Sequence, residues 1–86
     1  MSQLSVQTPE YESATTDQRI AAAVRALAAG RGIRNSDLAE VLGTSRTTIF
    51  AKIKGEAPWK AAEVEAAAEY FGVSVGALFD GLGLGL

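Results

Sequence analysis

Apolar side chains recur at helical spacing from Thr15 onward. Those that fall on one stripe of the first predicted helix are Ile20, Ala23, Val24 and Leu27. Thr15 and Gln18 have the three-residue spacing of a capping box, in which each side chain accepts a hydrogen bond from the other residue's backbone N–H. The segment AAGRG then stops the helix at Gly30 or Gly32, because glycine readily adopts the left-handed conformation that ends helices.

Four shorter helical segments are expected to follow, marked by polar N-caps and by glycines. Their expected ranges are 36–42, 46–54, 60–71 and 74–79. Asn35 and Ser45 are the predicted N-caps of the first two, because a side-chain oxygen there can accept from an otherwise unpaired backbone N–H. Gly43, Gly55 and Gly72 are expected to end three of these helices.

The chain divides into an arm, a helical domain and a tail. Residues 1–14 are polar and aperiodic, and are expected to form a disordered arm. Residues 15–79 carry the helical patterns and form one domain. The tail, residues 80–86, repeats Gly-Leu, and glycine at every second position makes it a poor strand by itself. No strand pattern precedes it, so the predicted fold class is all-α, a compact five-helix domain.

The second and third helices have the sequence features of a helix-turn-helix. Two short helices joined by three or four residues form this DNA-binding unit, and its second helix enters the major groove. Ala39 allows close helix approach, and Gly43 supplies the turn. Ile49, Ile53 and, more marginally, Lys52 lie on the side of the third helix that faces the core. The opposite face presents Arg46, Thr47, Phe50, Ala51 and Lys54. Arginine can bind guanine through two hydrogen bonds, threonine can bond a base edge, and apolar groups can contact thymine methyls.

Charge is unevenly distributed along the chain. The formal net charge is −2, yet residues 31–55 carry five basic residues against two acids, while the rest carries three against eight. The five are Arg31, Arg34, Arg46, Lys52 and Lys54. Residues 44–55 contain no acid at all. A basic patch on an acidic body is typical of a surface that binds a polyanion.

The segment SDLAEVLGTSRTTIFAKIKGEAPWKAAEVEAAAEYFGVSVGALF resembles the Cro/lambda-repressor (XRE-like) family of helix-turn-helix domains. The matching features are LAEVLG, the serine cap followed by TI, KIKG, and FGVS before a final leucine. The resemblance covers about residues 20–79 and implies a five-helix, lambda-repressor-like fold that binds operator DNA as a dimer and represses transcription. The size of the domain favours a small phage or prophage repressor acting in the cytoplasm of a bacterial host.

The resemblance also assigns contact residues. The base-reading positions are Arg46, Thr47 and Ala51, with Phe50 beside them. The phosphate-contacting positions are Asn35, Ser45 and Lys54. Lys52 is also expected to contact a phosphate, because it is a basic residue of the helix-turn-helix. Three of these positions depart from the family pattern: Asn35 replaces a usual glutamine, Ala51 a longer polar residue, and Lys52 a commonly apolar one whose ammonium is expected to reach past the core edge. The operator sequence therefore does not follow from the resemblance.

A dimer on a palindromic operator needs a contact between two copies. The C-terminal apolar residues are the candidates for this contact. They are Val75, Leu78 and Phe79 of the last helix, together with Leu82, Leu84 and Leu86, which an extended tail would place on one side. The alternative is a chain that pairs only on DNA.

Other functions are weighed against DNA binding. A protein-interaction module of the same fold, such as an antitoxin or a repressor-binding partner, is the main alternative, but it gives no reason for an acid-free segment. The chain has no cysteine or histidine, and Glu63, Glu65 and Glu69 are interpreted as a solvated face, so neither an enzyme nor a metal site is expected. Trp59 and Phe71 are expected in the core. No cofactor, membrane span or small-molecule ligand is expected.

Overall fold

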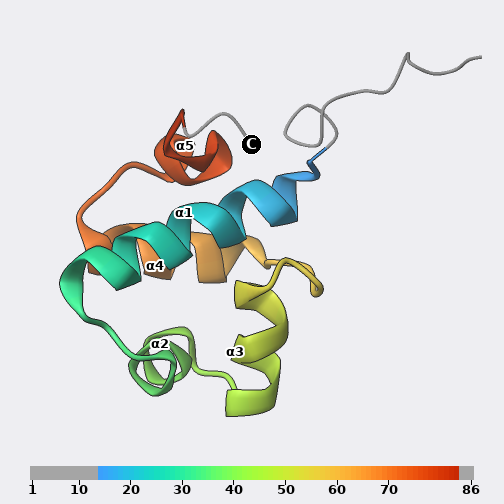
Figure 1. The fold of residues 1–86 in the computed structure, drawn as a ribbon, viewed down its shortest axis with the longest axis vertical. Helices are drawn as coiled ribbons and strands as arrows, with labels where there is room; N and C mark the ends of the chain where they lie inside the picture. The colour runs from blue at the N-terminus through green and yellow to red at the C-terminus, as the bar shows by residue number, and fades with distance from the viewer. Residues whose placement is uncertain (1–13, 84–86) are drawn as a thin grey trace, which may run out of the picture.

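Helix α1 (Thr16–Arg31) is the central element of the computed structural model, which describes residues 14–83. The other elements are α2 (Asn35–Leu42), α3 (Arg46–Ile53), α4 (Ala61–Phe71), α5 (Val75–Phe79) and a 3-10 turn, η2 (Gly81–Gly83). Figure 1 shows α5 on one side of α1 and the α2–α3 pair on the other. Residues 14–83 contain five α-helices and no strand, so the predicted all-α class is confirmed.

The start and end of α1 follow the predicted signals. The Thr15 hydroxyl accepts a hydrogen bond from the Gln18 N–H at 3.1 Å, and the Gln18 side chain accepts one from the Thr15 N–H at 2.9 Å. Gly32 rather than Gly30 ends the helix, with a left-handed φ of 65°. The residues expected in the arm lie almost wholly outside the described part, which starts at residue 14.

The predicted N-cap of α2 is wrong by one residue. Asn35 is the first residue of the helix, and Arg34 is the N-cap. The Asp37 carboxylate accepts a hydrogen bond from the Arg34 N–H at 3.2 Å, so an acceptor three residues further along satisfies the cap from inside the helix. The same carboxylate lies 3.5 Å from the Arg34 guanidinium.

One core joins all five helices. Its fully buried large side chains are Ile20, Val24, Leu38, Ile49, Val64 and Leu78. Buried alanines in α1 and α4 lack bulk and allow neighbouring helices to approach closely. Trp59 and Phe71 are buried in this core, as predicted. The close packing means that truncating any of the large side chains leaves a cavity.

Three arginines of α1 each bind the last residue of a different helix. Arg19 donates a hydrogen bond to the Phe79 carbonyl that ends α5, at 3.0 Å. Arg31 donates to the Phe71 carbonyl that ends α4, at 2.8 Å. Arg25 donates to the carbonyl that ends α3, that of Ile53. A cation at a helix C-terminus satisfies an unpaired carbonyl and stabilises the helix dipole. Thus α1 positions the ends of three neighbouring helices.

The C-terminal segment differs from the extended tail considered above. Leu82 lies in η2 with a left-handed φ of 57°, and it packs against the core instead of extending away from it. Leu78 is fully buried, so it is not available to a second copy, whereas Phe79 remains 41% exposed. Leu84 and Leu86 lie outside the described residues. In the described part of the chain, no helix has the length and apolar character needed to cross a membrane.

Candidate nucleic-acid interface

Helices α2 and α3 are joined by the three residues Gly43, Thr44 and Ser45. Gly43 has a φ of 67°, a conformation that an L side chain adopts only with strain. The Ser45 hydroxyl accepts a hydrogen bond from the Thr48 N–H at 3.2 Å and donates to the Thr48 hydroxyl at 3.0 Å. Ser45 is therefore the N-cap of α3, as predicted, and the short connection of a helix-turn-helix is present.

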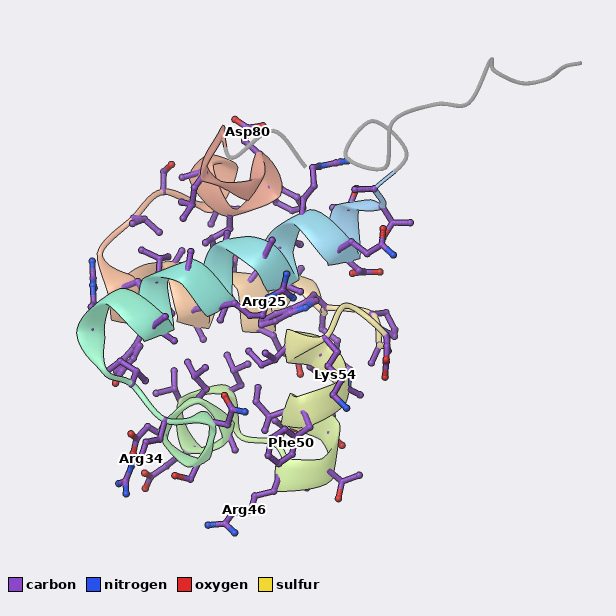
Figure 2. The ribbon with its side chains drawn as sticks, in the orientation of Figure 1. Arg25, Arg34, Arg46, Phe50, Lys54 and Asp80 are labelled. Atoms are coloured by element: carbon purple, nitrogen blue, oxygen red, sulfur yellow. The ribbon has the colours of Figure 1, made fainter. Side chains whose placement is uncertain are left out.

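The exposed face of α3 carries the residues expected to read bases. Arg46, Thr47 and Lys54 are exposed, Phe50 is 48% exposed and Ala51 is half-buried. Residues four apart share one face of a helix, and Figure 2 shows Arg46, Phe50 and Lys54 following one another along α3. Figure 2 also shows Arg46 pointing away from the body of the protein, beyond the end of the α2–α3 pair.

The opposite face of α3 is fully committed to the core. Ile49 is 0% exposed and Ile53 is 8% exposed. This confirms the predicted orientation of the helix about its axis. A buried face fixes which residues of a short helix remain outside, so the exposed set is determined by packing rather than by the polar residues themselves.

Lys52 lies on the core side of α3, as its helical spacing predicts, but its ammonium does not extend past the core edge. Its side chain is only 6% exposed, and its ammonium lies 2.9 Å from a Glu63 carboxylate oxygen. The ammonium also donates a hydrogen bond to the Pro58 carbonyl at 2.6 Å. Because a carboxylate and a carbonyl satisfy the charge inside the protein, Lys52 neither reaches past the core edge nor is available to a phosphate. The buried ion pair therefore argues against the expected phosphate contact of Lys52.

Glu63 also differs from its interpretation as part of a solvated face. Burial by itself raises the pKa of Glu63, but hydrogen bonds from the Lys60 N–H and the Lys52 ammonium, with the charges of both lysines, lower the pKa below its ordinary value of 4.5. Glu63 is therefore an anion at neutral pH and balances the Lys52 charge. Glu65 and Glu69 are exposed, as expected. Within residues 14–83, no three acidic, histidine or cysteine side chains gather as metal ligands.

Trp59 forms two hydrogen bonds that help to fix the C-terminal end of α3. Its indole N–H donates a hydrogen bond to the Lys52 carbonyl at 3.1 Å, and its backbone N–H donates to the Asp17 carboxylate at 2.8 Å. The turn after α3 is thereby fastened to both α1 and α3. Together with the buried ion pair, these bonds give α3 a fixed position relative to the core.

Two other residues were expected to contact phosphates from helix starts. Asn35 is half-buried in the first turn of α2. Ser45 is exposed, but its hydroxyl proton is directed at Thr48. The backbone N–H groups of both first turns carry the positive end of a helix dipole, which favours an anion nearby.

The five basic side chains of residues 31–55 do not lie together on one surface of the folded protein. Arg31 is directed at α4, where its guanidinium lies 5.4 Å from the Phe71 ring centroid. Lys52 is buried. Of the four basic residues of that segment that remain exposed, Arg34, Arg46 and Lys54 lie on or next to the α2–α3 pair. Arg34, whose side chain is 80% exposed, points outward at the same end of the α2–α3 pair as Arg46 (Figure 2). Arg34 is one of the five basic residues of that segment, but the sequence did not predict it at the site.

A second cation was missed altogether. Arg25 is exposed on α1, and its hydrogen bond to the Ile53 carbonyl places it at the C-terminal end of α3. No local signal distinguishes it from the other arginines of α1, since only the packing of α1 on α3 brings it here.

Comparison with protein families gives a match to a family described as BetR domain, over residues 12–84. Comparisons with curated proteins and with solved structures give no match.

Proposed function

The chain belongs to the BetR domain family, and we propose that it binds double-stranded DNA by placing α3 in the major groove. The observation that carries the proposal is the exposed face of α3, on which Arg46, Phe50 and Lys54 project without a neighbouring acid in the segment 44–55. The opposite face of the same short helix is buried in the core, so the direction of the exposed face is fixed. A rigid helix with exposed cations is the arrangement by which helix-turn-helix proteins read base edges.

Each exposed residue of α3 has a proposed role. Arg46 binds guanine O6 and N7 through two hydrogen bonds, and Thr47 bonds a neighbouring base edge. Phe50 and Ala51 contact thymine methyl groups. Lys54, at the far end of the helix, binds a backbone phosphate.

The remaining phosphate contacts come from the two helix starts. Asn35 and the backbone N–H groups at the start of α2 face one phosphate, and Ser45 another. Ser45 donates to a phosphate only if its hydroxyl turns away from Thr48, whose own hydroxyl is then free to rotate. Arg34 adds a further charge at this end. These contacts set the position of α3 in the groove but carry no sequence information.

At a finer level, we propose a transcriptional repressor of the Cro/lambda-repressor type, without enzymatic activity, that acts on a phage or prophage operator in the bacterial cytoplasm. One recognition helix covers few base pairs, so a homodimer on half-sites about 34 Å apart supplies the specificity. Among the described C-terminal apolar residues, Phe79 is exposed, and Val75 and Leu82 are half-buried, so these three remain at the surface for pairing two copies.

A protein-interaction module is the second candidate function. The observation in its favour is Phe50, which is 48% exposed at the centre of the α3 face. Exposed aromatic residues often anchor protein interfaces. The cations on either side of Phe50 favour DNA over an apolar partner surface.

Affinity for duplex DNA is expected to fall steeply with salt. Each phosphate neutralised by a lysine or arginine contributes about 0.9 to the slope of log affinity against log salt, so the two proposed cationic contacts per copy, Lys54 and Arg34, give about 1.8. A titration of the full chain with duplexes across a salt series, after selection of the preferred sequence from random duplexes, measures both slope and specificity. An affinity independent of salt, or equal for all sequences, contradicts the proposal.

Arg46→Ala and Lys54→Ala are expected to have different effects on DNA binding. Arg46→Ala should cost about 1–3 kcal/mol and relax the preference at one base position, whereas Lys54→Ala should weaken binding to all duplexes nearly equally and reduce the salt slope by about 1. Binding of each variant to the selected duplex and to its single-base variants separates the two. If both variants lose only non-specific affinity, the assignment of the reading face is wrong.

A further inference from the structure

Arg25 occupies a position that its two counterparts on α1 do not share. All three arginines donate to the last carbonyl of a helix, but Arg25 alone binds the helix that carries the proposed base-reading residues. The residue after Ile53 is Lys54, so the Arg25 guanidinium lies against the backbone at the end of α3, one residue before the proposed phosphate-binding lysine. Figure 2 shows both side chains in the region where α1 meets the end of α3.

The Arg25 guanidinium has unused hydrogen-bonding capacity. Arginine carries five N–H donors, and the described contacts of Arg25 use one of them. No carboxylate within residues 14–83 forms an ion pair with Arg25, and the residue is exposed. An exposed guanidinium with unused donors fits a group that carries negative charge and several acceptor oxygens.

We propose that Arg25 contacts a DNA backbone phosphate while it holds the C-terminal end of α3. This inference rests on the proposed DNA binding and extends the interface from the α2–α3 pair to α1. The planar guanidinium can donate to the Ile53 carbonyl along one edge and to phosphate oxygens along another. Because the carbonyl already orients the side chain, little rotational freedom is lost when the phosphate binds. The same group thereby links the position of the DNA backbone to the position of α3.

The test compares Arg25→Gln with Arg19→Gln in the full chain. Both substitutions remove one charge from α1 and one hydrogen bond to the last carbonyl of a helix. Arg19 binds α5, which lies on the opposite side of α1 from α2 and α3 (Figure 1). Arg19→Gln is therefore the matched control for charge and for helix capping. Circular dichroism establishes a temperature at which both variants are folded, and binding is measured there.

The DNA used is a mixed-sequence duplex of about 30 base pairs, long enough for two half-sites one helical turn apart. Arg25→Gln is expected to bind about ten-fold more weakly than the unchanged chain at low salt, the loss typical of one hydrogen bond to a charged group. Its salt slope should fall by about 0.9 per copy. Arg19→Gln should stay within about two-fold with an unchanged slope, since Arg19 binds α5 on the opposite side of α1 from α2 and α3 and has no proposed phosphate contact. Arg25→Lys keeps the charge and should preserve most of the slope.

The possible results distinguish failure of the Arg25 phosphate contact from failure of the proposed DNA binding. Equal effects of Arg25→Gln and Arg19→Gln overturn the phosphate contact and leave Arg25 as a helix cap. Lys54→Ala is measured alongside on the same duplex. If Lys54→Ala weakens binding while Arg25→Gln does not, only the inference fails. If the unchanged chain does not bind the duplex, both the inference and the proposed function are overturned.

Discussion

Ile49→Ala is expected to lower the free energy of unfolding by about 2–5 kcal/mol, the range for truncating a buried aliphatic side chain. Ile49 is 0% exposed and belongs to the core cluster that joins α3 to the other helices. Its removal leaves a cavity that the surrounding helices fill only in part. A domain of this size has a total stability of about 5–15 kcal/mol, so the loss removes a large share. Thermal and urea unfolding followed by circular dichroism measure it.

Phe50→Ala is the matched control for this prediction. The two residues are adjacent in α3, but Phe50 is 48% exposed and lies on the opposite face. Truncating an exposed side chain should change stability by no more than about 0.5 kcal/mol. Equal losses for the two variants, or an undiminished stability of Ile49→Ala, mean that α3 is rotated from the orientation described above.

The orientation of α3 was predictable because it follows from local spacing. Ile49 and Ile53 are four residues apart, and no other arrangement of that short helix buries both. The caps at Thr15 and Ser45 were also predictable, since the capping oxygen and the N–H it accepts from are separated by three residues in sequence. Local features of this kind determine the number, order and exposed faces of the helices.

The features that were missed depend on contacts between segments far apart in the sequence. Lys52 looked like a surface cation because its partner Glu63 lies in a different helix, and only the packing of α3 against α4 brings the two together. Arg25 looked like any exposed arginine, because its bond to Ile53 spans 28 residues. A charged residue on a helix can be exposed, buried with a partner or used as a cap, and the local sequence does not decide among these.

The N-cap of α2 was also predicted wrongly from the sequence, by one residue. Asn35 and Asp37 both have side-chain oxygens that can satisfy the start of a helix. The structure uses Asp37, which reaches back to the Arg34 N–H, and so places the helix start one residue earlier. Either residue would produce nearly the same helix, which is why the error leaves the position of α3 unaffected.

Glu63→Gln is expected to lower the free energy of unfolding by about 3 kcal/mol at neutral pH, the lower end of the range for breaking one side of a buried ion pair. The variant leaves the Lys52 ammonium, whose side chain is 6% exposed, with the Pro58 carbonyl as its remaining acceptor. Glu65→Gln is the control on the same helix, since Glu65 is exposed, and it should change stability by no more than about 0.5 kcal/mol. Urea unfolding at pH 7 measures both.

The effect of Glu63→Gln should also depend on pH in a defined direction. The folded protein holds the pKa of Glu63 below its ordinary value of 4.5, so the carboxylate stabilises the fold fully above that value. This contribution is lost as the pH falls through the lowered pKa, because the protonated side chain no longer balances Lys52. The difference in unfolding free energy between the unchanged chain and Glu63→Gln should therefore be constant from pH 7 to about pH 5 and shrink at more acid pH. A difference that stays the same down to pH 3 means that the carboxylate charge of Glu63 is not what stabilises Lys52.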